Sequence, residues 1–306
     1  MIDAIVSRGL QTLVVLWLIS LVSYWVQVTV TPLAGPATYG DYLAALVRGD
    51  LGESLFYKAP ALDIILEKFP ATLELVLGTG LLIGLVAVPA GVFTALAPRH
   101  WLARAIMAIS LLGISLPVFL SGTLLVYWFA VELNWLPVFG RGPVVWFGGW
   151  PTGLFSVAGL QHLLLPCSAL ALTLLPLFIR LIRAEMLIVL ASKHVLYARA
   201  MGLAPWRIWL RYGLRNALLP LVTMSGLQFG TLMAYALVVE NLFQWPGMGF
   251  LFMEAVTRSD GPLMAAYILV AGGIFLFTNI ITDLIYGLVD PRLAPWNRDK
   301  VSHESI

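Results

Sequence analysis

The 306-residue sequence has little charge, because aspartate, glutamate, lysine and arginine together make up only 11% of it. A soluble domain carries roughly 25% charged residues on the surface that it turns to water. Hydrophobic residues reach 60% here, even without the 27 glycines. The composition therefore excludes a soluble globular domain, a disordered chain and a coiled coil. It indicates a protein whose surroundings are partly lipid.

Cysteine and histidine, the usual ligands of metal centres, are also scarce. The single cysteine, Cys167, excludes a disulfide within the chain and a cysteine-based metal cluster. The four histidines lie far apart in the sequence, so no histidine metal site is expected. A net charge of +2 is too small to indicate nucleic acid as a partner.

Motifs for nucleotide hydrolysis and for intramembrane catalysis are missing as well. A P-loop requires Gly-Lys followed by Ser or Thr, and the sequence contains no Gly-Lys pair. His-Glu-x-x-His is absent, and no two acidic residues share a helix face within an apolar stretch. An intramembrane enzyme is therefore a remote alternative. An ion-coupled carrier is another, although a carrier normally shows more polar breaks near the middle of the membrane.

Six apolar stretches are long enough to cross a bilayer, which takes about 20 residues. We predict transmembrane helices over 9–30, 73–97, 102–131, 160–182, 219–243 and 263–288. Prolines inside the second, third and fourth stretches do not argue against them, because membrane helices tolerate proline. The first stretch is longer than the core of a signal peptide and lacks a small-x-small cleavage site, so we expect a retained anchor.

Basic residues predict the orientation. Six spans place both termini on one side, and that side carries 13 of the 18 lysines and arginines, so both termini are expected in the cytoplasm. The chain then consists of an N-terminal transmembrane helix (1–30), an extracytoplasmic loop with short helices (31–70), a five-helix core (71–290) and a cytoplasmic tail (291–306). Tryptophans in the second outer loop, 132–159, suit an interfacial position.

The cytoplasmic loop 183–219 is the most informative segment, because seven of the 18 basic residues lie in it or just before it. The loop is predicted to form two helices that are broken at Gly202, where a left-handed conformation would end the first. Pro205 suits the first turn of the second, whose apolar stripe is formed by Trp206, Leu210, Leu214 and Ala217. The pattern alone fits a surface helix at anionic headgroups as well as a docking element for a cytoplasmic protein.

Motifs in this loop and beyond it occur in an order typical of one transporter family. The loop contains Tyr-Ala-Arg-Ala-Met-Gly-Leu at 197–203 and Leu-Arg-Asn-Ala-Leu-Leu-Pro at 214–220. The other matching segments are Arg-Gly-Asp-Leu-Gly at 48–52, Phe-Pro-Ala-Thr-Leu-Glu-Leu at 69–75, Leu-Gly-Ile-Ser-Leu-Pro at 112–117, Trp-Leu-Pro-Val-Phe-Gly-Arg-Gly at 135–142, Val-Glu-Asn-Leu-Phe-Gln-Trp-Pro-Gly-Met-Gly at 239–249 and Asp-Pro-Arg-Leu at 290–293. The ordered set resembles the permease subunits of ABC importers, in their binding-protein-dependent dipeptide/oligopeptide/nickel branch and its first-permease "B" type.

The resemblance implies an all-α membrane protein with the type I ABC importer (MetI-like) permease fold, multi-pass in a bacterial cytoplasmic (inner) membrane. It implies a transport subunit and not an enzyme, with ATP and Mg²⁺ bound by two separate ATP-binding subunits. A homologous second permease, an extracytoplasmic binding protein and the lipid bilayer are the other expected partners. Di- or oligopeptides are the expected cargo, and nickel chelates, antimicrobial peptides, opines or other small amides stay open.

Candidate site residues follow from the resemblance and from polar positions near the spans. The resemblance places the ATPase-coupling helix at Tyr197, Ala198, Arg199, Ala200, Gly202, Leu203 and Arg207. Structural or gating candidates are Pro117, Pro220, Glu240, Trp245, Pro246, Gly247 and Asp283, and Gln228 is a candidate for the pathway. Glu74, Glu132 and Glu240 fall near predicted span ends, so we expect their carboxylates to reach water. Asp283 lies deeper, where a charge is costly and is a functional candidate by default.

Overall fold

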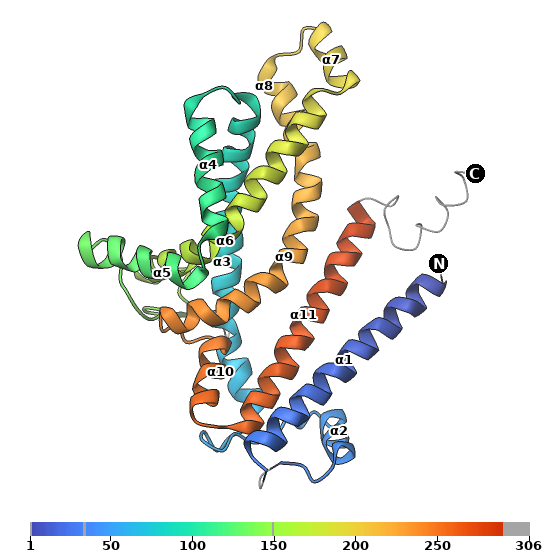
Figure 1. Cartoon of the computed structure of the whole chain (residues 1–306), viewed down its shortest axis with the longest axis vertical. Coiled ribbons are helices and arrows are strands. Elements are labelled where there is room, and N and C mark those ends of the chain that lie inside the picture. Colours follow the sequence, from blue (N-terminus) through green and yellow to red (C-terminus); the bar gives the residue numbers. More distant parts are fainter. Residues whose placement is uncertain (1, 33–34, 149, 290–306) are drawn as a thin grey trace. The chain divides into compact units, whose positions relative to one another are not determined.

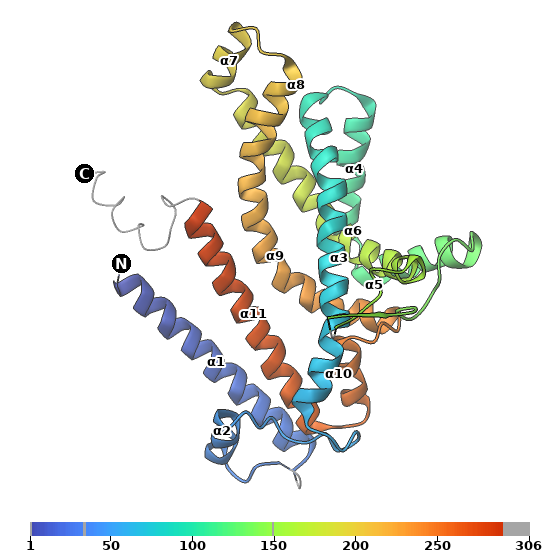
Figure 2. The same ribbon diagram turned by 180° about the vertical axis from the view of Figure 1, so that it is seen from behind.

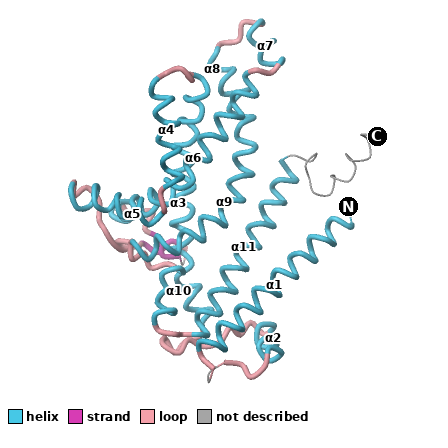
Figure 3. The backbone as a smooth tube through the Cα atoms, in the orientation of Figure 1, coloured by secondary structure: helices cyan, strands magenta, loops and turns pink. Residues whose placement is uncertain are grey.

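The computed structural model describes residues 2–32, 35–148 and 150–289 (Figure 1). Within these ranges the regular structure is helical except for one short β-hairpin, as Figure 3 shows. The chain divides into two compact units. The terminal unit contains the residues up to Thr72 together with those from Pro246 onward, and the central unit runs from Leu73 to Trp245.

The terminal unit contains the two ends of the described chain. Its helices are α1 (Ile2–Val30), α2 (Tyr39–Val47), the first turns of α3 (Ala61–Leu96), α10 (Met248–Thr257) and α11 (Gly261–Val289). Helices α1 and α11 lie side by side in both views (Figures 1 and 2), with Gly272 packed directly against Ile19. The Ser23 hydroxyl donates to the carbonyl of Ala265 over 2.7 Å. Small residues and interhelical hydrogen bonds of this kind hold membrane helices together where lipid removes the hydrophobic drive.

A second contact region of the terminal unit joins α3, α10 and α11. Its buried core is formed by Ala61, Ile64, Ile65, Met248, Leu251, Ala255, Leu263 and Ala266. The backbone N–H of Met248 donates to the Thr72 hydroxyl over 2.8 Å, which fixes the start of α10 against α3.

The central unit is arranged around α6 (Val157–Leu190). Its other elements are the rest of α3, α4 (Trp101–Ser115), α5 (Val118–Leu125), the π-helix η1 (Val126–Glu132), β1 (Val145–Phe147), β2 (Trp150–Thr152), α7 (Lys193–Ala200), α8 (Pro205–Arg207), the π-helix η2 (Ile208–Leu214) and α9 (Arg215–Leu242). Helix α6 packs against α4, α5 and α9. Its apolar window is 61% buried, against 17% for α1 and 11% for α11, so α6 is the core helix of the described chain.

The approach of α3 to α6 depends on a glycine. A Cβ atom built on Gly91 would lie 2.7 Å from the Cβ of Ile182, closer than two such atoms can approach. We therefore expect Gly91→Ala to lower the thermal unfolding midpoint of the detergent-solubilised protein, at a cost of about 1–3 kcal/mol for overpacking. Gly84→Ala is the matched control on the same helix, because a Cβ there meets nothing within 4 Å. Equal melting of the two variants would contradict this packing.

The predicted spans are found in part. Four helices are long and apolar enough to cross a membrane, at Gly9–Val30, Ala61–Leu96, Val157–Leu190 and Gly261–Thr282. They correspond to the predicted first, second, fourth and sixth spans. The predicted fifth span is a bent pair of helical segments, Pro205–Val222 and Met224–Leu242, which makes a fifth candidate if it is counted as one.

The predicted third span, 102–131, is not one helix, and the count of six is therefore not confirmed. The chain is extended at Leu116 (ψ 124°), between α4 and α5, and Pro117 is the residue before the first turn of α5. Proline has no N–H for the helix and disfavours the helical conformation in the residue before it. The prediction that a membrane helix continues through Pro117 is therefore wrong.

The loops also differ from the prediction. The outer loop 31–70 contains the expected short helix, α2, but α3 begins at Ala61, well before the predicted start at 73. With 36 residues α3 is about 54 Å long, so it extends beyond a hydrocarbon layer of about 30 Å. Within the loop 183–219, α6 continues to Leu190, α7 covers Lys193–Ala200, and helical structure resumes at Pro205. The predicted tail, 291–306, lies outside the described residues.

The second outer loop, 132–159, contains a β-hairpin that was not predicted. Strands β1 and β2 pair antiparallel, with Phe147 opposite Trp150. A sequence signal was present, because Gly148-Gly149 between two short apolar runs is typical of a two-residue hairpin turn. The hairpin brings the part of the loop that contains Thr152 and Gly153 to the side of α3.

Candidate functional site

The predicted coupling residues lie in the last turn of α7, in the turn that follows it and in α8. Gly202 has a φ of +75°, so it adopts the left-handed conformation predicted for it. Its N–H donates to the carbonyl of Arg199 (3.0 Å), and the N–H of Leu203 donates to the carbonyl of Ala198 (3.2 Å). These two bonds are the Schellman arrangement that ends a helix at glycine. Pro205 opens α8, as predicted.

A small core holds this turn in place. Val195 of α7, Ala198 of α7 and Ile208 of η2 are buried against one another. Partly buried side chains that pack around them are Val189, Leu190, Leu203 and Tyr212. These residues come from the end of α6, from α7, from the turn and from η2, so the core joins the turn to the helices on both sides of it.

The outer face of the turn is exposed. Tyr197, Met201 and Trp206 are 67%, 66% and 56% exposed. Of the predicted coupling set, Arg199, Ala200, Gly202 and Arg207 are exposed together with Tyr197, whereas Ala198 is buried and Leu203 is half-buried. The Arg207 guanidinium lies 5.3 Å from the centre of the Trp206 ring. Exposed tyrosine, tryptophan and arginine on a fixed support are typical of protein-binding surfaces.

The apolar stripe predicted for the second helix is only partly buried. Trp206 and Leu210 are exposed, Leu214 is half-buried and Ala217 is buried, while Ile208 and Gly213, outside the stripe, are buried as well. Within η2, the i→i+5 hydrogen bonds rotate the side chains away from the positions that a spacing of 3.6 would give.

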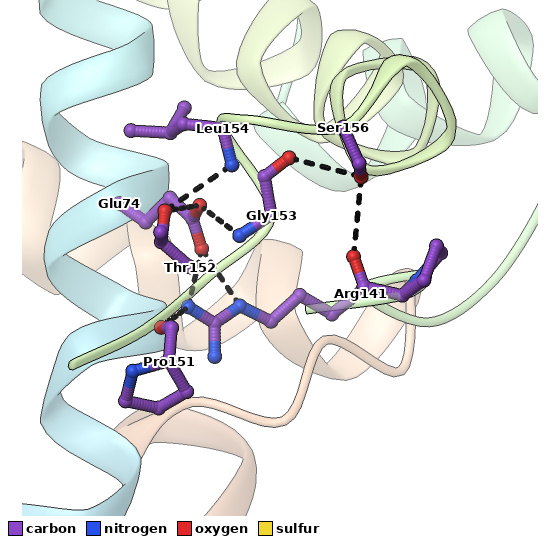
Figure 4. Close-up of polar contacts among 8 residues, drawn as sticks. Glu74, Arg141, Pro151, Thr152, Gly153, Leu154 and Ser156 are labelled. Carbon is purple, nitrogen blue, oxygen red and sulfur yellow. Dashed lines mark hydrogen bonds and ion pairs between the residues drawn. The ribbon is translucent and has the colours of Figure 1, made fainter. Parts of the chain in front are cut away.

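A second candidate site lies at the other end of the central unit, where a buried carboxylate meets a buried guanidinium (Figure 4). Glu74 of α3 and Arg141 have side chains only 3% and 9% exposed. Arg141 binds one carboxylate oxygen through Nη2 (2.5 Å) and Nε (2.7 Å). The other oxygen accepts from the Thr152 hydroxyl (2.9 Å) and the Gly153 N–H (2.8 Å). Arg141 also donates to the carbonyl of Pro151 over 2.6 Å.

This buried junction extends to the turn that follows α9. The N–H of Gly140 donates to the carbonyl of Phe243 (2.9 Å), and the Arg141 guanidinium lies 6.0 Å from the Trp245 ring. The Trp245 N–H donates to the carbonyl of Glu240 over 2.8 Å. The junction therefore connects α3, the hairpin and the end of α9.

The expectation that acidic residues near span ends reach water is wrong for two of the three. Glu74 and Glu240 are buried, with residue exposures of 5% and 0%, whereas Glu132 is exposed. Glu74 is buried because it has a partner, Arg141, which the sequence presented only as one of five outer basic residues. The signal that could have found the pair was a lone glutamate and a lone arginine, each in an apolar setting on the same side of the membrane.

The remaining candidates do not gather in one site within either unit. Pro220 and Gln228 lie half-buried in α9, and Trp245 is buried at the end of the central unit. Gly247 is buried and precedes α10 in the terminal unit, where Pro246 is exposed. Asp283 lies in α11, and its side chain is outside the described part of the structure. Among the described residues, no group of three or more His, Cys, Asp and Glu side chains could hold a metal ion.

Residues 87–295, more than half of the chain, match the family of the binding-protein-dependent transport system inner membrane component. The chain belongs to this family of ABC importer permeases. The permease is 38% identical over 267 residues to the di/tripeptide transport system permease protein DppB of Pseudomonas aeruginosa, covering 83% of this chain and 80% of the relative. It is 34% identical over 286 residues to the dipeptide transport system permease protein DppB of Alkalihalophilus pseudofirmus, covering 88% and 81%. The glutathione transport system permease protein GsiC of Escherichia coli K12 is 34% identical over 255 residues, covering 83% and 78%.

Solved structures show the same fold for the permease. The inward-facing MetNI methionine ABC transporter matches 75% of the permease and 97% of its own chain, with a TM-score of 0.59 and 16% identity. An amino acid ABC transporter matches 76% and 95%, with a TM-score of 0.50 and 14% identity. The predicted all-α permease fold is therefore confirmed. The permease is an integral membrane transport subunit of an importer that also has ATPase and binding-protein components.

Proposed function

We propose that the permease imports di- or oligopeptides that an extracytoplasmic binding protein delivers, with ATP hydrolysed by two separate ATP-binding subunits. The observation that carries the coupling role is the turn at Gly202, which is fixed from behind by a small core and exposes Tyr197, Trp206 and Arg207. The peptide substrate is supported by the relatives, two of which are named as di/tripeptide and dipeptide permeases.

We further propose six membrane crossings with both termini in the cytoplasm of a bacterium, in the inner membrane. The turn between α3 and α4 and the turn between α7 and α8 lie at the same end of the central unit (Figures 1 and 2). Arginines lie in or beside both turns, Arg99 and Arg104 at the first and Arg199 and Arg207 at the second, so the positive-inside rule supports a cytoplasmic location for both. The chain between them must then go out and return, which supports a crossing by α4 in spite of the break at Pro117.

The coupling turn is proposed to transmit the motion of the ATPases to the membrane helices. When the two ATP-binding subunits close on ATP and Mg²⁺, the turn moves with the groove that holds it. Because the core of Val195, Ala198 and Ile208 joins the turn to α6 and η2, both helices follow. A homologous second permease completes the pathway, for which Gln228 of α9 is a lining candidate.

Uptake by a reconstituted importer tests this function. The permease is co-expressed with the second permease, the ATPases and the binding protein of the same transport system, and is placed in proteoliposomes with ATP inside. We expect uptake of a radiolabelled dipeptide that requires both ATP and the binding protein. Uptake by the permease alone would contradict the proposal and indicate a carrier.

Glutathione is the second candidate substrate, because GsiC relatives of the permease are named as glutathione transport proteins. The same proteoliposomes decide between the two substrates when unlabelled glutathione competes with the labelled dipeptide. Strong competition at concentrations where a second dipeptide competes weakly would assign glutathione as the cargo.

A further inference from the structure

The loop before α3 in the terminal unit presents an exposed aromatic tip. Glu53 and Pro60 form an antiparallel bridge, and the N–H groups of Ser54 and Lys58 donate to the carbonyls of Ala59 and Ser54 over 3.0 Å. Four residues between Glu53 and Pro60 are exposed and form what we call the aromatic tip: Leu55, Phe56, Tyr57 and Lys58. The proposed orientation places the tip outside the membrane.

A buried carboxylate ties the aromatic tip to α11. Asp260 is only 1% exposed and precedes the first residue of α11. One of its oxygens accepts from the Ser54 hydroxyl (2.5 Å) and the Phe56 N–H (3.2 Å), and the other accepts from the Leu263 N–H (3.2 Å). The same side chain therefore caps the helix and holds the loop.

Helix α10 and the turn after it hold the aromatic rings from the side. The Arg258 guanidinium lies 3.4 Å from the centre of the Phe56 ring, and it binds Oε1 of Glu254 through Nη2 (2.6 Å) and Nε (3.1 Å). The Tyr57 hydroxyl donates to Oε2 of Glu254 over 2.6 Å. That hydrogen bond is the main reason that the pKa of Glu254 is lowered, and burial together with Glu254 raises the pKa of Tyr57 to about 12.

These contacts fix the rings without covering them. Phe56 stays 48% exposed and Tyr57 38% exposed. Lys58 and Ser259 have φ angles of 54° and 53°, a conformation that costs energy outside glycine and is common at functional sites. A loop that only connected α2 to α3 would need neither exposed rings nor this support. Rigid aromatic and arginine side chains lower the ordering cost of binding and are typical of interface hot spots.

Charge indicates what binds the tip. In the segment 39–67, five acidic residues are exposed, and they are Asp41, Asp50, Glu53, Asp63 and Glu67. The exposed cations of this segment are Arg48 and Lys58, and two further cations lie beside it, each paired with an acid: Lys68 with Glu67 (2.8 Å) and Arg258 with Glu254 (2.6 Å). Acidic residues therefore still outnumber basic ones around the tip. A surface with excess negative charge is repelled by anionic lipid headgroups and attracts a protein with a basic rim. A protein partner on the outer side is the component that gives this family its description.

We propose that the aromatic tip is a docking contact for the extracytoplasmic binding protein, which offers an apolar socket for Phe56 and Tyr57 with a basic rim. Asp260 is then a positioning residue that shapes the tip from the start of α11. This inference rests on the proposed function, because it requires the orientation and the partner named there.

Binding of the partner measures the contribution of the tip. The complete importer is placed in nanodiscs, and the probe is the fluorescently labelled binding protein of the same transport system. We expect Phe56→Ala to raise its Kd by about tenfold or more, as for an interface hot spot, and Phe56→Trp to keep most of the affinity. Val47→Ala is the matched control, since Val47 is 89% exposed in the same outer segment but outside the tip.

The outcomes separate the docking site from the substrate. A Kd for Phe56→Ala within about twofold of the wild-type value overturns the docking site, and a tip that lies on the bilayer would give this result. Failure of the wild-type importer to take up dipeptide, with the tenfold effect on Kd intact, would refute the proposed substrate and leave the docking site supported.

Asp260→Asn should weaken binding less than Phe56→Ala, because the amide oxygen still accepts hydrogen bonds. An equal or larger loss would show that Asp260 does more than position the tip.

Discussion

Replacing Gly202 by proline is expected to leave the permease in the membrane and to abolish ATP-driven uptake. The φ of +75° at Gly202 is closed to proline, whose ring fixes φ near −65°. Proline also lacks the N–H that donates to the carbonyl of Arg199, so the turn loses both its shape and one of its two capping bonds. Since no membrane helix contains this residue, insertion should be normal.

Uptake and ATP hydrolysis, measured in the same proteoliposomes, test the effect of Gly202→Pro. We expect uptake to fall to background, while the ATPases either lose their stimulation by the loaded binding protein or hydrolyse ATP without transport. Gly202→Asn is the graded control, because asparagine enters the left-handed conformation more readily than other residues with a Cβ. It should keep much of the activity. Normal uptake by the proline variant would refute the coupling role of the turn.

Replacing Glu74 by leucine is expected to destabilise the permease by roughly 3–5 kcal/mol, the cost of leaving a buried charge without its partner. Arg141 would keep only the carbonyl of Pro151 as an acceptor among the bonds described for it. The Thr152 hydroxyl and the Gly153 N–H would lose theirs at the same time. The hairpin should therefore detach from α3.

The thermal unfolding midpoint of the detergent-solubilised protein measures the destabilisation by Glu74→Leu. All variants are heated at one fixed scan rate, because membrane proteins often unfold irreversibly. Glu74→Gln keeps an acceptor oxygen for Thr152 and Gly153 and should fall between the wild type and the leucine variant. The double variant Glu74→Leu/Arg141→Leu should recover part of the loss, since it removes the unpaired charge as well. A leucine variant that melts at the wild-type temperature would show that the buried pair contributes nothing.

Local chemistry made the coupling turn predictable from the sequence. Glycine at the end of α7 and proline at the start of α8 each have a conformational preference that needs no tertiary contact. Long apolar helices were predictable for a similar reason, since a length of about 20 residues is set by the bilayer alone. The family resemblance added the role of the turn, which no backbone rule contains.

Tertiary pairing was the part that the sequence did not reveal. Glu74 and Arg141 are 67 positions apart, and each on its own resembles a charge at the edge of the membrane. The buried side of η2 could not be predicted either, because a stretch of i→i+5 hydrogen bonds changes which side chains are buried and has no sequence signal of its own. The break at Pro117 was visible as a proline, but whether a membrane helix bends or ends there depends on its neighbours.

The burial of Glu74 and Arg141 has a consequence for how the hairpin can open. A charge pair in a dry setting cannot be loosened gradually, because a partial separation loses the attraction before water can replace it. Release of the hairpin would therefore be a wetting event, in which solvent enters the junction as the two charges part. The Glu74–Arg141 pair is either formed and dry or separated and hydrated, and intermediate positions of the hairpin should be sparsely populated.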